Sequence, residues 1–486
     1  MPAGSWRSWG RRPGACLLAV LVTLALVASA AAASRGSSQD RRERDPTGVV
    51  RVAYPEEPAS WYPVGREQPA SIDLAALWGL PLYRVDSYGQ LRPALAESSE
   101  VHPGSEGAPW EVDVRLRQGS WSDGRPVVSA DVVATLEAVR SVRPSHLEAL
   151  VAATEVDERT VRLTFSRPYG RWPYLLAGGI SVLPAHVLAV SGLEAYSKGV
   201  PVAGGPFRLE RHDPGLRAIF LAHPDGPTGA PALHRVDVYF TPSYETALGL
   251  LGAHKIDVGL GYLALNPLER ARRVEGVDSA APLGGTWTSL HWRPGGRLAS
   301  SPQRRTGARD AVSVAELVEG LLGRAGEVMT STIPGIEGPW HRLPGPTVRL
   351  GRLDVEVLVP AYQEALHFTA RALLLDLAGG GIDVQLVRIE PDELAERAAG
   401  EADGSLLVRR DLPRPSLVDR APADAPAELL ALLAAADDAG SAEAPVLGFA
   451  FERLREHASE LPLYRMGVAH VWRRPLQGFR ASAWPG

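Results

Sequence analysis

The second half of this 486-residue chain alternates between patterns typical of strands and patterns typical of helices. Runs of branched and aliphatic residues predict strands, and the longer stretches between them have the spacing of helices; the strands fall at 353–359, 382–387 and 405–408, and the helices at 365–377 and 391–399. Parallel strands need a crossover between them, and a helix is the usual crossover. The sequence therefore predicts an α/β fold with a parallel sheet in this half.

A second ordered passage lies at residues 95–136. Residues 110–117 alternate between apolar and charged side chains, as a half-buried strand does. Residues 122–126 have the composition of a turn, since glycine accepts a positive φ and proline fixes φ. Ser129 is then a candidate N-cap, and Asp131 falls in the first helical turn, where the helix dipole favours a negative charge.

This strand-turn-helix passage resembles the signature of the family 5 extracellular solute-binding proteins, the dipeptide, oligopeptide and nickel receptors of bacterial ABC importers. Their usual form is Leu-Ala-Glu-Ser-Trp, a strand ending in Leu-Arg-x-Gly, then Phe-Ser-Asp-Gly-x-Pro and Ala-Glu-Asp-Val. The chain departs from that form with Ser99 in place of Trp and Trp121 in place of Phe. Residues 182–188, 203–209 and 255–258 resemble further family segments.

The resemblance implies an α/β, two-lobed type II periplasmic-binding-protein fold with an extra subdomain in the first lobe. We expect the first lobe at 49–284, including the inserted subdomain at about 90–200, the second lobe at 285–460, and a return to the first lobe at 461–486. The second lobe looks shortened, because the region between Trp292 and Leu353 holds less helical material than the family normally carries. Strands that cross between the lobes are expected near 283–292 and 460–464.

The N-terminus predicts export. Arg7, Arg11 and Arg12 precede a long run of apolar and small residues at 15–33, with small side chains at its end, as in a cleaved signal peptide. The run is also near the ~20 residues that a membrane span needs, so an uncleaved anchor remains an alternative. We expect a signal peptide at 1–33 and a flexible tether at 34–48, with the protein in the cell envelope or outside the cell. Cys16 is the only cysteine, so cleavage near residue 33 leaves no thiol and no disulfide.

Composition and motifs argue against several function classes. Acidic residues outnumber basic ones, 56 to 51, and no basic patch stands out, so nucleic acid is not an expected partner. The chain has no His-Glu-x-x-His, no Gly-x-Ser-x-Gly and no phosphate-binding loop, and its twelve histidines are scattered. We therefore expect no catalytic residues, no metal site, no cofactor and no enzymatic activity.

The resemblance also suggests where a ligand would be held. In the family's peptide binders, an aspartate after a second-lobe strand pairs with the ligand's amine, and Asp411 occupies the corresponding place; its alternative is a loop carboxylate paired with Arg409 or Arg414. Arg409 or Arg410 could hold a ligand carboxylate by two parallel hydrogen bonds, although solvated surface arginines are the simpler interpretation. Aromatic candidates are Trp287 and Trp292 at the first crossing, for which core packing is the alternative, and Trp61 and Tyr62 before Pro63, which could face the cleft.

These expectations combine into one functional hypothesis: the chain is the extracytoplasmic substrate-binding component of an ABC transporter. It would bind a peptide or similar small solute by hinged closure of its lobes and deliver it to the permease complex, acting as a monomer. The alternative, suggested by the shortened second lobe, is a membrane-associated sensory or scaffold protein that keeps the fold without import.

Overall fold

The computed structural model describes residues 48–474, 476, 479 and 481. The gaps within this range are 65–67, 87–89, 105–108, 143–146, 148, 171, 178, 294, 295, 299, 330–352, 361–363, 391, 392, 394–396, 398, 399, 401, 411–425, 440–459, 475, 477, 478 and 480. The expected signal peptide and almost all of the tether, the core of the predicted helix at 391–399, and Asp411 therefore lie outside the described residues. By contacts the chain divides into Met1–Gly48 with Pro475–Gln477, and Val49–Arg474 with Gly478–Gly486. Every described helix and strand belongs to the second of these units.

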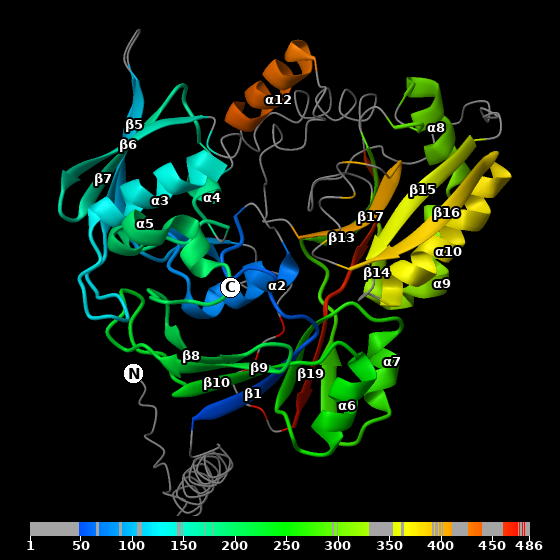
Figure 1. The fold of residues 1–486 in the computed structure, drawn as a ribbon, viewed down its shortest axis with the longest axis horizontal. Coiled ribbons are helices and arrows are strands. Elements are labelled where there is room, and N and C mark those ends of the chain that lie inside the picture. Colours follow the sequence, from blue (N-terminus) through cyan, green and yellow to red (C-terminus); the bar gives the residue numbers. More distant parts are fainter. Residues whose placement is uncertain are drawn as a thin grey trace, which may run out of the picture. The chain divides into compact units, whose positions relative to one another are not determined.

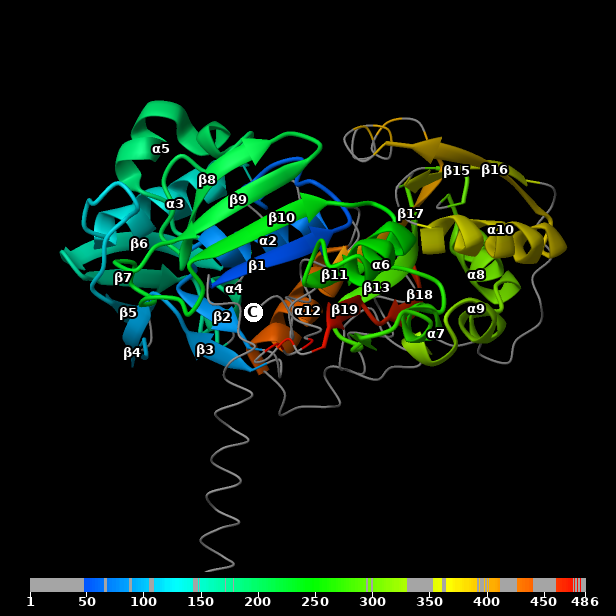
Figure 2. The ribbon, with the colours of Figure 1, turned by 90° about the horizontal axis from the view of Figure 1, so that it is seen from below.

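The first sheet has seven strands in the order β12-β19-β11-β1-β10-β9-β8, and Figure 2 shows β8, β9, β10 and β1 side by side. Its central strand β1 runs parallel to β10 and β11, and the remaining pairs are antiparallel. Helix α6 packs on the sheet through Tyr244, Ala247 and Leu248, which share one apolar core with Ala53 and Val471. The bounds are β1 Val49–Tyr54, β8 Phe207–Asp213, β9 Arg217–Ala222, β10 Arg235–Phe240, β11 Val258–Tyr262, β12 Val277–Ala280, β19 Ala469–Arg473, α2 Pro69–Trp78, α6 Tyr244–Gly252 and α7 Pro267–Arg272.

Between α2 and β8 the chain builds a separate antiparallel sheet, in the order β4-β5-β7-β6, covered by α3. The alternation that predicted a strand at 110–117 is confirmed by β5, and β7 alternates in the same way; the inward residues Val112, Val114 and Leu163 are fully buried. The bounds are β2 Tyr83–Val85, β3 Leu91–Pro93, β4 Ala96–His102, β5 Trp110–Leu116, α3 Ser129–Val142, β6 Leu150–Asp157, β7 Thr160–Phe165, α4 Trp172–Leu175, α5 Ala185–Ser191 and η3 Gly192–Tyr196.

The second large sheet has six strands in the order β14-β18-β13-β17-β15-β16, with α10 lying along β15 and β16 in Figure 1. Strand β15 runs parallel to β16 and β17, which confirms the parallel arrangement predicted from the strand–helix alternation. Strand β13 joins this parallel part to β18 by antiparallel pairing on both sides. The bounds are β13 Thr286–Trp292, α8 Pro302–Ala311, α9 Val314–Leu321, η4 Gly323–Ala325, β14 Gly326–Val328, β15 Leu353–Pro360, α10 Glu364–Gly379, β16 Ile382–Ile389, β17 Gly404–Arg410, α12 Ala427–Ala439 and β18 Glu460–Met466.

Two short links carry the described chain between the seven-stranded and six-stranded sheets. Residues 281–285 connect β12 of the first sheet to β13 of the second, and residues 467–468 connect β18 of the second to β19 of the first. The strands that the two links extend are paired with each other and antiparallel in both sheets: Ala280 pairs with His470 in the first sheet, and Trp287 pairs with Arg465 in the second. The two sheets are therefore joined by two neighbouring strands of opposite direction.

Candidate functional site

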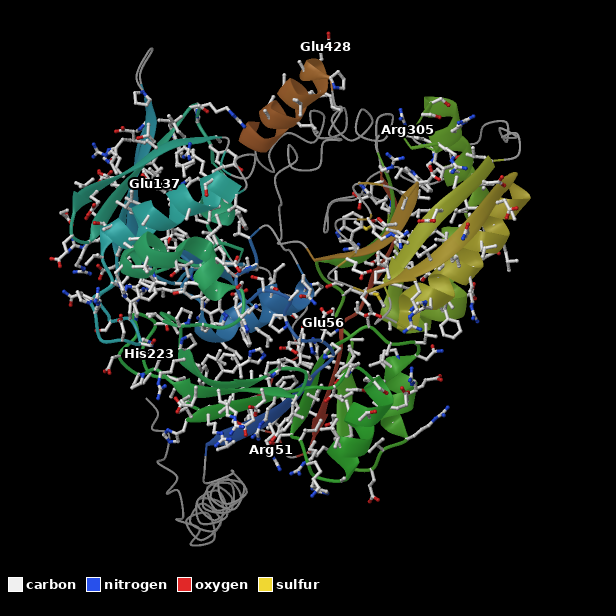
Figure 3. The ribbon with its side chains drawn as sticks, viewed as in Figure 1. Arg51, Glu56, Glu137, His223, Arg305 and Glu428 are labelled. Atoms are coloured by element: carbon white, nitrogen blue, oxygen red, sulfur yellow. The ribbon has the colours of Figure 1, made fainter. Side chains whose placement is uncertain are left out.

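The carboxyl ends of the parallel strands form the candidate site. In open α/β sheets, ligands bind beyond the carboxyl ends of the strands, where loops and strand order leave a crevice. Here β11 ends at Tyr262, whose partner Ala469 begins β19, and β17 ends at Arg410, whose partner Thr286 begins β13. The link at 281–285 and the link at 467–468 therefore both run between the two sheets at the carboxyl ends of the parallel strands. In Figure 3, Glu56 marks the segment just beyond the carboxyl end of β1, whereas Arg51 lies within that strand.

Tyrosine hydroxyls hold the chain at this end of the first sheet. Tyr54 donates to Asp73 over 2.7 Å, and Tyr262 donates to the carbonyl of Thr241 over 2.9 Å. Tyr244 donates to the carbonyl of Pro267, also over 2.9 Å. Burial raises the pKa of Tyr262 and of Tyr244 above the usual range, so both stay protonated donors. These bonds fix the loops that follow β1, β10 and β11.

At the corresponding end of the second sheet, three arginines lie next to Trp287 or Thr286 in the strand register. The antiparallel register sets Arg410 opposite Thr286 and Arg409 opposite Trp287, with Arg465 opposite Trp287 on the other side. Arg465 forms an ion pair with Glu327 over 3.1 Å. The predicted candidates Arg409, Arg410 and Trp287 are therefore neighbours at one sheet end, although no contact of the two arginine side chains is described. Asp411, the next residue along, lies outside the described residues.

The two predicted tryptophans of β13 lie on opposite faces of that strand. Trp292 is 2% exposed and belongs to the apolar core that α9 and α10 share with β13, together with Leu290 and Leu406. Trp287 is fully buried and lies on the other face. Packing accounts for the burial of Trp292, and a ligand contact for either tryptophan remains a prediction.

The predicted pair Trp61 and Tyr62 lies in the first part of the chain and packs there. The ring of Trp61 contacts the rings of His212 and Phe220 edge-on, at 5.2 and 5.9 Å between centroids. Tyr62 donates its hydroxyl to the carbonyl of Ser181 over 3.0 Å, and burial raises its pKa. Both side chains are at most 2% exposed. No described contact brings this pair together with Trp287 or Trp292, and its role as a ligand surface also stays a prediction.

The signature passage has a structural role that the residue pattern did not reveal. Asp131 is 3% exposed and accepts three hydrogen bonds: from the Trp121 indole over 2.9 Å, the Val128 amide over 2.9 Å and the Ala185 amide over 2.8 Å. Our prediction that Ser129 is the N-cap of helix α3 is wrong, because the helix already begins at Ser129, whose hydroxyl donates to the carbonyl of Asp157 over 2.6 Å. Instead, Asp131, the third residue of the helix, accepts from the amide of Val128, the residue just before the helix.

The turn at Gly204 and Gly205 packs against the same passage. A Cβ on Gly204 would lie 2.5 Å from the Trp121 ring, and a Cβ on Gly205 would lie 2.5 Å from the carbonyl oxygen of Gly79. Only residues without a side chain fit between these groups. This close approach explains why two glycines precede Pro206 and Phe207 at this point of the chain.

Within the described residues, no group of three or more His, Cys, Asp or Glu side chains is arranged to hold a metal ion. Across the same part of the chain, none of the helices combines the length and the apolar character needed to cross a membrane.

The sequence and the fold both match known proteins. Residues 90–401 match the family model described as bacterial extracellular solute-binding proteins, family 5 Middle. The peptidoglycan-binding protein YepA of Agrobacterium fabrum is 34% identical over 113 residues, covering 22% of this chain and 18% of that protein. The oligopeptide-binding protein OppA of Mycobacterium tuberculosis is 29% identical over 200 residues, covering 38% and 33%. The alignments thus span at most a third of these relatives.

Solved structures match over nearly the whole chain. The oligopeptide-binding protein AppA of Bacillus subtilis, in complex with a nonapeptide, has a TM-score of 0.77 at 17% identity, covering 90% of this chain and 96% of that one. AgaA of A. tumefaciens R10, in complex with agropinic acid, has a TM-score of 0.78 at 19% identity, covering 89% and 94%. The likeness confirms the predicted α/β, two-lobed type II periplasmic-binding-protein fold.

Proposed function

We propose a function from one established premise: the chain belongs to family 5 of the bacterial extracellular solute-binding proteins, whose model matches residues 90–401, more than half of its length. The family comprises extracytoplasmic binding proteins of ABC transporters and is not enzymatic. On this premise, the chain captures a peptide or similar small solute by closing two lobes over it and delivers it to an ABC permease. It does so as an exported monomer, held near the membrane by its N-terminal segment if that segment is not cleaved.

One observation carries the proposal: two antiparallel links join the two sheets at the carboxyl ends of their parallel strands. Two bodies joined by a pair of strands can rotate about those strands, and rotation closes whatever crevice lies at the joined ends. Closure expels water and strengthens polar contacts to the captured solute. The arrangement suits reversible capture, since it needs no reacting group.

The ligand contacts are proposed from the second-sheet end. Asp411 pairs with a cationic group of the ligand, and Arg409 or Arg410 holds a carboxylate, for which a planar guanidinium is well shaped. A peptide with free termini carries both groups. Trp287, between Arg409 and Arg465 in the sheet register, supplies an apolar wall, with Trp292, Trp61 and Tyr62 as the further aromatic candidates.

The alternative function, a sensory or scaffold protein without import, was suggested by a shortened second lobe. The chain covers 96% of AppA and 94% of AgaA, so the fold likeness lends that alternative no support. We therefore put solute capture first. A transporter operon next to the gene would favour import, and an isolated gene would favour the alternative.

Thermal unfolding in the presence of ligand pools tests the proposal. A ligand at a hundred times its Kd stabilises the folded state by about 2.7 kcal/mol. The pools should contain di- to nonapeptides, a nickel–histidine complex and sugar–amino acid conjugates of the opine type. We expect a peptide pool to raise the melting temperature.

Two substitutions connect the result to the proposed contacts. Asp411→Ala and the double change Arg409→Ala with Arg410→Ala should abolish the stabilisation. Arg371→Ala, on the exposed side of α10, is the matched control and should keep it. Stabilisation by no pool would refute solute capture, and stabilisation that survives Asp411→Ala would refute the role of that aspartate.

A further inference from the structure

The two links between the sheets touch each other backbone to backbone. Gly467 begins the second link, and Ala281 begins the first. An ideal Cβ built on Gly467 would lie 2.2 Å from the carbonyl oxygen of Ala281, 2.8 Å from its carbonyl carbon and 2.9 Å from its Cβ. Real Cβ atoms do not approach other atoms closer than 3.0 Å, so a side chain at position 467 would force the links apart.

The neighbour, and not the local backbone, is what requires glycine at this position. Gly467 is a described residue and does not have a positive φ, so its backbone conformation is one that an L-residue can adopt. By contrast, Gly261 has a φ of +80° and would be strained by any side chain regardless of its surroundings. Substitution at 467 therefore tests one contact, the one between the two links.

Gly467 is also fastened to the second sheet's side of the molecule. Its amide donates to the carbonyl of Ala325, in the 3-10 turn η4, over 2.7 Å. Leu263 and Leu265, which follow β11 of the first sheet, pack against the apolar core of the second sheet. The two bodies are thus in contact around the links, and the two links meet at Gly467 and Ala281.

We infer that Gly467 is the pivot of the two bodies: its missing side chain lets the two links rotate against each other at Ala281. The inference builds on the proposed lobe closure and assigns it to one residue. An alanine methyl at 467 would push the links apart, because ordinary van der Waals contact begins at 3.4 Å and its Cβ would lie only 2.2 Å from the carbonyl oxygen of Ala281. The links must separate by 1.2 Å, the difference of these two values, and rigid bodies amplify a displacement at their pivot.

The test measures the distance between the two bodies without any ligand. Spin labels go on cysteines at Val190, 85% exposed on α5, and Leu375, 76% exposed on α10, in a chain whose only native cysteine is changed by Cys16→Ser. Double electron–electron resonance then gives the distribution of inter-label distances. We expect Gly467→Ala to displace the mean by more than the inserted 1.2 Å.

Gly119→Ala is the matched control, because it also creates a backbone clash. A Cβ on Gly119 would lie 2.4 Å from the amide nitrogen of Pro227, and this contact lies far along the chain from both links. A purely structural role for Gly467 predicts that both variants lower the melting temperature and that neither moves the labels. We expect Gly119→Ala to lower the melting temperature while leaving the label distance unchanged.

Two results of the distance measurement would contradict the pivot. An unchanged distribution in folded Gly467→Ala, or an equal displacement in Gly119→Ala, overturns the pivot. Should Gly467→Ala fail to fold, Ala281→Gly replaces it: a glycine frees the backbone of the first link at the contact and should broaden the distribution, and an unbroadened one again overturns the pivot. Because no ligand is present, this failure is distinct from a failure of solute capture, which the thermal screen reports.

Discussion

The carboxylate of Asp131 is a buried group whose removal should lower the stability of the described fold strongly. It is buried in the signature passage and accepts bonds from the Trp121 indole and the amides of Val128 and Ala185. These donors belong to the turn before α3, the approach to α3 itself and the start of α5. One side chain thus ties together three segments that are separate in the sequence.

The size of the effect of Asp131→Ala follows from these three donors. Each buried N–H left without an acceptor costs about 1–3 kcal/mol, so the three together would cost about 3–9 kcal/mol. Burial, the largest influence on this group, raises the pKa of Asp131, which means that the folded state bears part of the cost of burying its charge. That cost disappears in the variant, so the lower end applies and we expect a loss of about 3 kcal/mol.

Urea unfolding followed by far-ultraviolet circular dichroism measures this loss as a change in the free energy of unfolding. Asp123→Ala is the control, since Asp123 lies in the turn before α3 and is exposed, where it pairs with His186 over 2.9 Å and accepts from the Arg125 amide over 3.1 Å. An exposed pair of this kind contributes about 0–1 kcal/mol. A loss in Asp131→Ala no greater than in Asp123→Ala would refute the argument that the three donors depend on this carboxylate.

Three further predictions follow from the same reasoning. The pKa of Asp113 is lowered, chiefly because Arg162 donates to its carboxylate over 2.7 Å, so the carboxylate stabilises the fold above pH 3.8 and this stabilisation is lost as the pH falls through the lower pKa of the folded state. The free energy of unfolding of Asp113→Asn should therefore differ from that of the native chain by about 1 kcal/mol at pH 6, and the two should converge below pH 3.8. A difference that grows as the pH falls would contradict this. Tyr464→Phe should lose about 1–2 kcal/mol in urea unfolding, because Tyr464 and Thr369 share a fully buried hydrogen bond of 2.6 Å; an unchanged midpoint would show that the bond contributes nothing net. Gly205→Ala should destabilise by about 2 kcal/mol or more through its clash with Gly79, whereas Gly249→Ala, in the middle of α6 with open space around it, should stabilise by about 0.5–1 kcal/mol; the same sign for both would show that the clash does not control the outcome.

Much of the local structure could be predicted because each element repeats one pattern. The alternation at 110–117 has the two-residue period of a half-buried strand, and β5 buries the predicted set of side chains. The parallel part of the second sheet followed from the order of elements, since a helix between two strands places them parallel. Such patterns are local or depend only on chain order, and one sequence contains them fully.

The contacts at Ser129, Asp131 and Gly467 depend on partners that no local pattern names. Ser129 looks like a cap from its neighbours, yet its hydroxyl finds the carbonyl of Asp157, 28 residues away. The sequence predicts Asp131 in the first helical turn, where it lies, but the bond from Ala185 to Asp131 spans 54 residues. Gly467 carries no signal beyond its residue type, and its reason is the backbone of Ala281 on the other link. Such pairs become visible only once the chain is folded.

The position of the pivot also bears on which residues can take part in capture. Substituting a group at the sheet ends changes what the closed form holds, whereas substituting Gly467 changes whether that form is reached. A ligand lowers the free energy of closure only by its preference for the closed form. Changes at Asp411 should therefore weaken binding without altering the ligand-free label distance, and Gly467→Ala should alter that distance whether or not a ligand is present. If one variant moved both readouts equally, the site and the pivot could not be separate parts of the molecule.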